Sequence, residues 1–364
     1  MLPRIFTIKS HQPINKTLLL GPHIKLNTMY QLSLVPESKL RCSRDRGSID
    51  LFFSLVDYRN SYFTSNDPRK IFEFYEGFKD REELIEWMRE RPKGVSYIHE
   101  TEGNKDVIVV IPTADYNGKL AKSCREEIFK GLHVIFVESG ISNHYFSYEH
   151  NCNTGIKKAL EYNPKWIIIS NDDVIKIDDS SILVRQLGSL SGSNSDVVFV
   201  TENVGRHSNT FSFKKITKIS LYIARILHLF KIKISRSSVI YLHGKFNSLY
   251  FVYPLNGDLV DKLFPTIFSY KNVEDFFIVS GSFARKNEGI LFDEMYINGY
   301  EDQDFSLVKL KECKLAQIAY KIGSYTSATM SRGLGYSLRN VANGVYFNSR
   351  IKDLTIRQSK ILSK

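Results

Sequence analysis

The sequence predicts an α/β fold with an open, mostly parallel sheet and flanking helices. Between Asp106 and Asp173, strand-like runs of β-branched residues alternate with segments of helical periodicity, which is typical of a doubly wound sheet. The first run, "DVIVVIPT" at 106–113, is continuously apolar, as expected for a strand buried on both faces of a parallel sheet. The α/β domain is predicted to span residues 105–340.

Residues 1–104 are predicted to form a small β-rich and helical addition before this domain. The runs "RIFTI", "YQLSLV" and "IDLFFSLV" alternate in polarity, which indicates short strands. Residues 67–92 are predicted to be helical, with a break near Gly77 and an end before Pro92. The polar segment "HETEGNK" that follows is expected to mark the domain boundary.

Within the α/β domain, helices are expected at 117–130 and in "TGIKKALEY", and strands in "HVIFVESG" and "KWIIISNDD". Polar residues follow the strands, namely Thr113 and Asp115, then Glu138, then Asn171, Asp172 and Asp173. Ligands of doubly wound sheets bind at the carboxyl ends of the strands. Adjacent carboxylates there suit Mg²⁺ or Mn²⁺, which also binds substrate phosphates. The alternative is that Asp172 and Asp173 only close a turn or cap a helix.

A second acidic cluster occurs in "NGYEDQDFSL" at 298–307. Glu301, Asp302 and Asp304 lie within four positions, behind a Gly-Tyr turn and ahead of an apolar helical run. Acids are favoured in the first turn of a helix, because its free N–H groups and dipole attract negative charge. The cluster is therefore either a helix start or a group of catalytic carboxylates.

Composition limits the classes of partner. The chain has 364 residues and a formal net charge of +11, which favours anionic partners. It contains no nucleic-acid recognition motif and no P-loop pattern, so nucleic acid is not expected as a partner. The four cysteines lack zinc-ligand spacing, and the sequence shows neither a signal peptide nor an apolar stretch of spanning length. We expect a cytoplasmic protein, peripheral at most on the cytoplasmic face of the membrane.

Taken together, these segments resemble the inverting, GT-A type nucleotide-sugar glycosyltransferases of family 2, over roughly residues 106–335. "VIVVIPTAD" is similar to the family's opening strand, "VESG" to the acidic end of its second strand, "NTGIKKAL" to its Asn-x-Gly helix and "NDDV" to its DxD-type metal motif. "VSGSFARKNEG", "LFDEMY" and "GYEDQDFSLVKL" follow the acceptor-side block in the same order.

The resemblance implies a GT-A (Rossmann-like) fold and metal-dependent, inverting transfer of a sugar from a nucleotide-diphosphate donor to a hydroxyl of a glycan or lipid-linked acceptor. It implies that Asp302 is the general base and that Asp173 binds Mg²⁺ or Mn²⁺. The implied donor-binding residues are Pro112, Thr113, Asp115, Glu138 and Asp172. The implied acceptor-binding residues are Gly281, Ser282, Glu301 and Asp304, although Asp304 also suits a role in supporting the helix start.

The sequence departs from the family pattern at three points. Ala114 stands where an aromatic residue often stacks on the base, so Tyr116 would have to take that role. Cys152 replaces an arginine, and no histidine follows His243, which leaves Arg332 as a cationic contact for the diphosphate. These departures motivate an alternative function, a non-catalytic glycan- or lipid-binding module on a degenerate GT-A fold.

Two further segments are basic and amphipathic. Within 214–236, the apolar residues expected on one helical face are Ile216, Ile219, Ile223, Ile226, Leu227, Phe230 and Ile234. This helix either packs on the domain through its apolar face or lies in the plane of an anionic bilayer, near a lipid-linked acceptor. Residues 341–364 are expected to form a basic C-terminal tail.

Overall fold

The computed structural model describes residues 59–141, 143, 145–201, 210–232, 234–254, 264–273, 275–324 and 333–362. The chain divides into two compact units, Met1–Asp50 and Leu51–Lys364, and all described residues belong to the second. The strands predicted in "RIFTI", "YQLSLV" and "IDLFFSLV" lie outside the described residues, as does Arg332.

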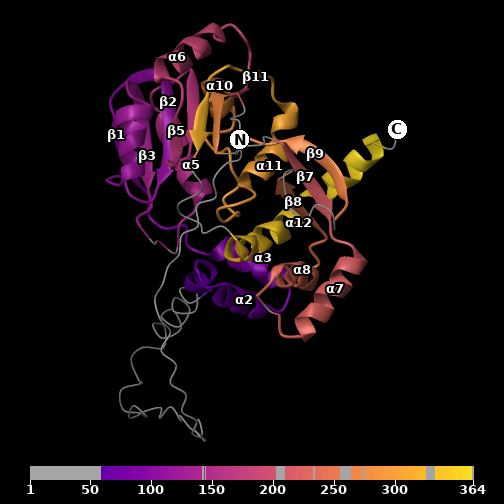
Figure 1. Ribbon diagram of the computed structural model, residues 1–364. Helices are drawn as coiled ribbons and strands as arrows, with labels where there is room; N and C mark the ends of the chain where they lie inside the picture. Colours follow the sequence, from indigo (N-terminus) through magenta and orange to yellow (C-terminus); the bar gives the residue numbers. More distant parts are fainter. Residues whose placement is uncertain are drawn as a thin grey trace, which may run out of the picture. The chain divides into compact units, whose positions relative to one another are not determined.

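Within the described residues, the core is a seven-stranded mixed sheet with the strand order β1-β3-β2-β4-β10-β6-β11 (Figure 1). Strands β3, β2, β4, β6 and β11 run in one direction, whereas β1 and β10 run in the other. The bounds are β1 Tyr97–Thr101, β2 Asn104–Thr113, β3 Leu132–Glu138, β4 Trp166–Ser170, β6 Val197–Phe199, β10 Phe276–Ser280 and β11 Leu315–Gln317. The predicted α/β class with a mostly parallel sheet is confirmed.

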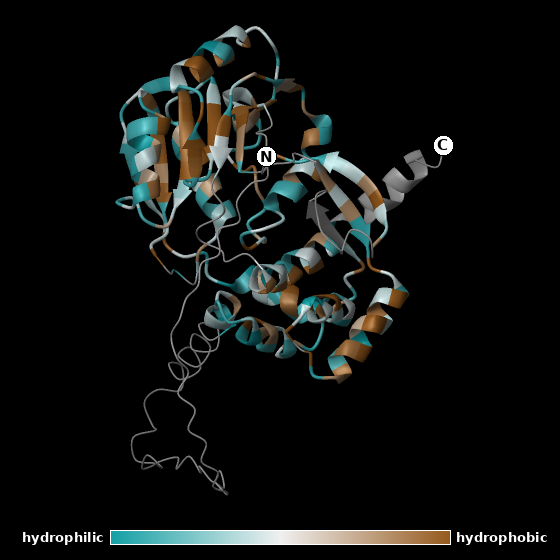
Figure 2. Cartoon of the chain, in the orientation of Figure 1, coloured by the Kyte–Doolittle hydropathy of each residue, from teal (hydrophilic) through white to brown (hydrophobic). Residues whose placement is uncertain are grey.

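Helices cover both faces of this sheet, and Figure 2 shows its apolar strands between more polar helices. Val109 and Ile111 of β2 pack on one face with residues of α4, the following π-turn and α6, whereas Ile108 and Val110 pack on the other with residues of α5, α10 and α11. Burial on both faces explains why this strand is continuously apolar. The bounds are α4 Lys119–Ser123, the π-turn Cys124–Ile128, α5 Tyr148–Leu160, α6 Ser180–Ser189, α10 Gly281–Lys286 and α11 Glu301–Val308.

The helix predicted at 67–92 is two helices, α2 Pro68–Glu76 and α3 Arg81–Glu90, with the break at Gly77 as expected. Their N-caps are Asp67 and Asp80, whose side chains accept backbone N–H groups of the first turn. Both helices pack in one apolar core with residues of α8 Arg236–Lys245 and α12 Leu334–Leu362. The boundary predicted between residues 104 and 105 falls at the start of β2, and the preceding strand β1 already belongs to the main sheet because it pairs with β3.

An insertion leaves the main sheet after β6 and returns at β10. It contains a three-stranded sheet of the order β8-β7-β9 and a helical hairpin of α7 and α8. The segment 214–236, predicted as one helix, instead comprises the end of β7, then α7, then the start of α8, because Lys214 and Lys215 pair in the sheet and a Thr217–Ser220 capping box starts the helix. The bounds are β7 Thr210–Lys215, α7 Lys218–Leu229, β8 Tyr250–Pro254 and β9 Thr266–Lys271.

The predicted C-terminal tail begins inside α12. The side chains of Leu338, Val341, Ala342 and Val345 are buried against α2 and α3, so this part of the helix belongs to the core. A two-stranded sheet of β5 Val174–Lys176 and β12 Ile322–Ser324 completes the described strands. Among the described residues, no helix combines the length and apolarity needed to cross a membrane.

Candidate functional site

The carboxyl ends of β2, β3 and β4 bring the first group of predicted residues together. Thr113 and Glu138 are partners in the β2–β3 register, and Thr113 Oγ1 donates a hydrogen bond of 2.7 Å to Asp172 Oδ2. Burial raises the pKa of Asp172, and the hydrogen bond from Thr113 partly offsets this. Pro112 is buried within β2, and Asp173 is buried beside Asp172. The residues predicted to bind the donor at the ends of these strands therefore lie together in a compact polar cluster.

Glu138 is held on both carboxylate oxygens. Tyr116 N–H donates to Oε1 at 3.2 Å, and His99 Nε2 lies 2.7 Å from Oε2. The His99 ring stacks on Tyr116 at 4.2 Å between centroids, and the Arg125 guanidinium lies 4.7 Å from the centre of the same ring. Tyr116, expected to stack on a nucleobase, thus already carries a stacked histidine.

Asp115 closes the turn after β2. Its Oδ1 accepts the Asn117 N–H at 2.9 Å, and its carbonyl oxygen accepts the Gly118 N–H at 3.1 Å. This is an Asx turn leading into α4. The described contacts of Asp115 therefore shape the loop beside the donor edge.

The reversed direction of β10 joins the second acidic cluster to this edge. Because β10 is antiparallel to β4, its amino end lies at the carboxyl end of β4, where Asn171 N–H donates to the Asp275 carbonyl oxygen at 3.0 Å. Just before β10, Asn272 Nδ2 donates to Asp302 Oδ2 at 2.5 Å. Ser306 Oγ donates to Asn272 Oδ1 at 2.8 Å, so the start of α11 is tied to the same edge.

Asp302 has the electrostatic surroundings of a proton acceptor. Burial is the largest influence on its carboxyl and, with the nearby Asp275 charge, raises its pKa to about 6, whereas the hydrogen bond from Asn272 acts in the opposite direction. A carboxylate with this pKa is ionised near neutral pH and binds a proton more strongly than an exposed aspartate does.

Glu301 is paired with a second carboxyl, Glu149 of α5. Burial, the charge of Glu149 and the charge of Asp302 raise the pKa of Glu301 well above its usual range, and the pKa of Glu149 is raised by burial as well. Each carboxyl influences the other, and the shift of Glu301 favours its protonated form. The buried Arg91 side chain supplies positive charge near Glu149, which favours the ionised form of Glu149.

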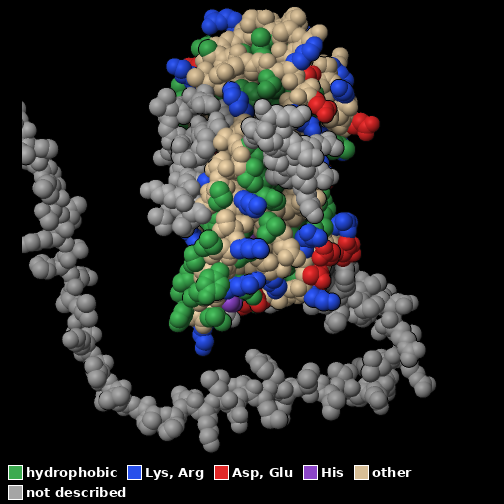
Figure 3. Space-filling model, turned by 90° about the vertical axis from the view of Figure 1, so that its right-hand side faces the viewer, with side chains coloured by type: hydrophobic (Ala, Val, Ile, Leu, Met, Phe, Trp, Pro, Cys, Tyr) green, Lys and Arg blue, Asp and Glu red, His purple; other side chains and the backbone are tan. Residues whose placement is uncertain are grey.

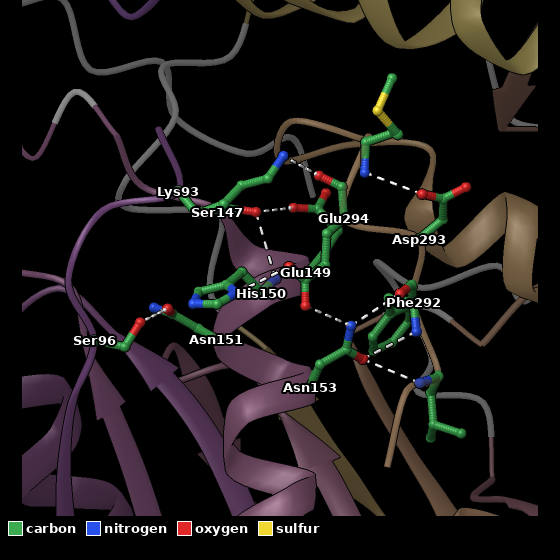
Figure 4. A network of polar contacts seen from close by, with 12 residues as sticks. Lys93, Ser96, Ser147, Glu149, His150, Asn151, Asn153, Phe292, Asp293 and Glu294 are labelled. Carbon is green, nitrogen blue, oxygen red and sulfur yellow. Dashed lines mark hydrogen bonds and ion pairs between the residues drawn. The ribbon is translucent and has the colours of Figure 1, made fainter. Parts of the chain in front are cut away.

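Figure 4 shows how the Asn-x-Gly segment of α5 holds the loop before α11. Asn153 Oδ1 accepts the N–H groups of Leu291 and Phe292 at 3.0 and 3.1 Å, and Asn153 Nδ2 donates to Glu294 Oε1 at 3.1 Å. Gly155 lets α5 approach the sheet, since a Cβ there would lie 2.4 Å from Val110 Cγ1. These residues shape the site from outside it.

Three of the residues predicted to bind the acceptor, Gly281, Ser282 and Asp304, do not face the edge that carries Asp302. Gly281 and Ser282 follow the carboxyl end of β10, beside Lys165 and the start of β4, at the edge opposite Asp275. A five-residue strand separates the two edges by about 15 Å. The structure therefore does not bring Gly281 and Ser282 to the edge that carries Asp302, because β10 runs antiparallel to β4.

Asp304 is also turned away from the edge, although it lies on the same helix as Asp302. Its Oδ1 accepts from Arg350 Nε of α12 at 2.8 Å and from the Tyr296 hydroxyl at 3.2 Å. Burial raises the pKa of Asp304, and the charge of Arg350 opposes this shift. Asp304 therefore anchors α11 to α12.

Five residues near this edge were not anticipated, namely Arg91, His99, Glu149, Asn272 and Asp275. Asn272 and Asp275 precede the buried run "FFIVS", and polar residues flanking such a run are the signal that could have identified them. The others come from β1, from the residue directly after α3 and from the start of α5, whose proximity depends on long-range packing.

In the part of the chain that the structure describes, no three His, Cys, Asp or Glu side chains are grouped so that they could hold a metal ion between them. No family model matches the chain, and neither does any curated protein or solved structure.

Proposed function

We propose that the protein is an inverting glycosyltransferase that moves a sugar from a nucleotide-diphosphate donor to an acceptor hydroxyl. One observation carries the proposal: Asp302, whose pKa is about 6, is tethered through Asn272 to the sheet edge that holds Thr113 and Asp172. A proton acceptor and a polar donor edge are the two parts that this reaction needs in one place.

In the proposed reaction, Asp302 removes the proton of the acceptor hydroxyl as that oxygen attacks the anomeric carbon, and the bond from this carbon to the nucleoside diphosphate breaks on the opposite face. Asn272 orients the carboxylate by donating to its Oδ2. The raised pKa of Glu301 favours its protonated form, so Glu301 is able to donate a hydrogen bond to a sugar hydroxyl without adding a full second negative charge beside Asp302.

The carboxylate of Asp173 suits a hard cation as a ligand. Asp173 supplies carboxylate oxygens at the end of β4, and Mg²⁺ commonly takes one or two protein carboxylates together with substrate phosphates. Asp173 would hold Mg²⁺ or Mn²⁺, and the ion would offset charge on the departing diphosphate. The phosphates of the nucleotide-sugar would then supply the remaining ligands of the ion, which is consistent with the small number of protein ligands at this edge.

The test is the release of nucleoside diphosphate from a panel of nucleotide-sugars, with and without Mn²⁺, using the full chain. Turnover is expected with at least one donor and should be lost in Asp302→Asn but kept in Glu312→Gln, which alters an exposed acid on the turn after α11. Stabilisation of the protein by glycans, with no turnover of any donor, would instead favour the non-catalytic binding module.

A further inference from the structure

Helix α7 packs on its neighbour through its least bulky face. Ser220 and Ala224 are buried, and Leu221 lies so close to Gly244 of α8 that a Cβ there would be 2.6 Å from Leu221 Cδ2. The His228 ring stacks on Tyr241 at 4.0 Å between centroids. The contact between the two helices therefore uses Leu221, small residues and two stacked rings, and does not include the other large apolar residues of α7.

Those large residues face outward. Ile219 is 72% exposed, Tyr222 66%, Leu229 81% and Phe230 73%, and Ile223 and Ile226 are also exposed. Their spacing of three or four residues places them on one stripe of the helix. Of the two alternatives for this segment, packing on the domain through the apolar face does not fit these exposures. Figure 2 shows the helix in brown at the lower right, and Figure 3 shows hydrophobic side chains gathered at the lower end of that side.

The charged side chains of α7 itself are all positive. Lys218, Arg225 and Lys231 are exposed on or directly after the helix, and Figure 3 shows Lys and Arg side chains beside the apolar ones. No aspartate or glutamate occurs in the sequence between Glu202 and Asp258. Two copies of this surface facing each other would juxtapose like charges, which disfavours a symmetric dimer. An anionic surface complements both the stripe and its flanks.

We propose that α7 is a membrane-docking helix that lies in the headgroup region of an anionic lipid bilayer. The docking surface consists of Ile219, Tyr222, Ile223, Ile226, Leu229 and Phe230, with the basic side chains of Lys218, Arg225 and Lys231. The apolar stripe enters the boundary between headgroups and acyl chains, and the basic side chains meet lipid phosphates. The proposal does not depend on sugar transfer, because the surface is defined by exposure and charge alone.

The test is flotation of the full-length protein with vesicles of phosphatidylcholine alone or mixed with phosphatidylglycerol. The protein should float with the mixed vesicles only, and rising salt should weaken recovery. The triple variant Ile219→Ser, Leu229→Ser, Phe230→Ser should bind at least about tenfold more weakly. All three positions are exposed, so the fold should survive, and circular dichroism checks this.

Two controls make the result specific. The triple variant Val95→Ser, Ile141→Ser, Ile290→Ser removes exposed apolar residues from other elements and should bind as the wild type does. Lys218→Gln with Arg225→Gln should lower binding to mixed vesicles by about tenfold or more, since each charge near such a surface contributes about fivefold.

Equal recovery with neutral and anionic vesicles would overturn the proposal, as would unchanged binding of the α7 triple variant. Sedimentation equilibrium without lipid provides a further test. A dimer that dissociates only in the α7 variant would show that a second copy covers this face, and would also overturn it.

Discussion

Replacing Asp302 by asparagine should separate catalysis from stability. The pKa of Asp302 is raised from an ordinary 3.8 to about 6, so the folded state binds this proton more tightly than the unfolded chain does. The ionised carboxylate therefore destabilises the fold. That penalty is absent below about pH 4, grows between pH 4 and 6, and is complete above about pH 6.

The size of the effect follows from the shift. Each pKa unit corresponds to about 1.36 kcal/mol, so the difference between 3.8 and about 6 amounts to at most about 3 kcal/mol. Asparagine resembles the protonated acid. Asp302→Asn should thus raise the free energy of unfolding by up to about 3 kcal/mol at neutral pH and leave it almost unchanged near pH 4.

The same substitution should lower the rate of sugar transfer although it raises stability. General-base catalysis contributes about 10²- to 10⁴-fold, or about 3 to 5 kcal/mol of activation free energy, and Asp302→Asn should lose it while donor affinity stays nearly constant. In the wild type, kcat should fall below about pH 6 with the slope of one proton. Asn272→Ala removes a hydrogen bond that lowers the pKa of Asp302. In this variant the fall of kcat should therefore begin at a higher pH.

The assays are diphosphate release across pH and urea unfolding at about pH 4 and about pH 7.5. The reasoning fails if Asp302→Asn retains transfer within a few-fold of the wild type. It also fails if the variant loses more stability at neutral than at acidic pH, since the carboxylate would then be a stabilising group and not a strained one.

Three further substitutions test the placement of other residues. Asp304→Asn should lower the free energy of unfolding by about 1 to 3 kcal/mol, because it breaks the partly buried ion pair with Arg350. The kcat of the folded variant should stay within a few-fold of the wild-type value. Complete loss of transfer would assign the general base to Asp304. Gly281→Ala should lower the urea midpoint, since its Cβ would lie 2.0 Å from the Pro164 carbonyl oxygen, and a selective rise in acceptor KM would argue against its position at the opposite edge. Asp173→Ala should weaken nucleoside-diphosphate binding in Mn²⁺ by calorimetry with the fold intact, and binding that resists both this change and a chelator would remove the metal assignment.

Much of the main sheet and part of the site follow from local sequence patterns. The apolar run at 106–113 predicts a strand buried on both faces, and it is β2 in the middle of the sheet. Because parallel strands end at the same edge, the polar residues after β2, β3 and β4 were expected to converge, and the bond between Thr113 and Asp172 realises this. The period of the apolar residues and the alternation of strands and helices along the chain are enough to predict this convergence.

Tertiary structure decided which side chains face the site. The direction of β10 brings Asn272 to Asp302 and takes Gly281 to the other edge, and nothing in a five-residue apolar run reveals its direction. Asp302 and Asp304 lie on one helix, but only packing against Arg350 of α12 turns the second away. Likewise, an amphipathic pattern in α7 predicts an apolar face, whereas the small residues that fit against α8 determine that this face points outward. Sequence periodicity defines which residues share a face, but the neighbours that a face meets depend on contacts between distant parts of the chain.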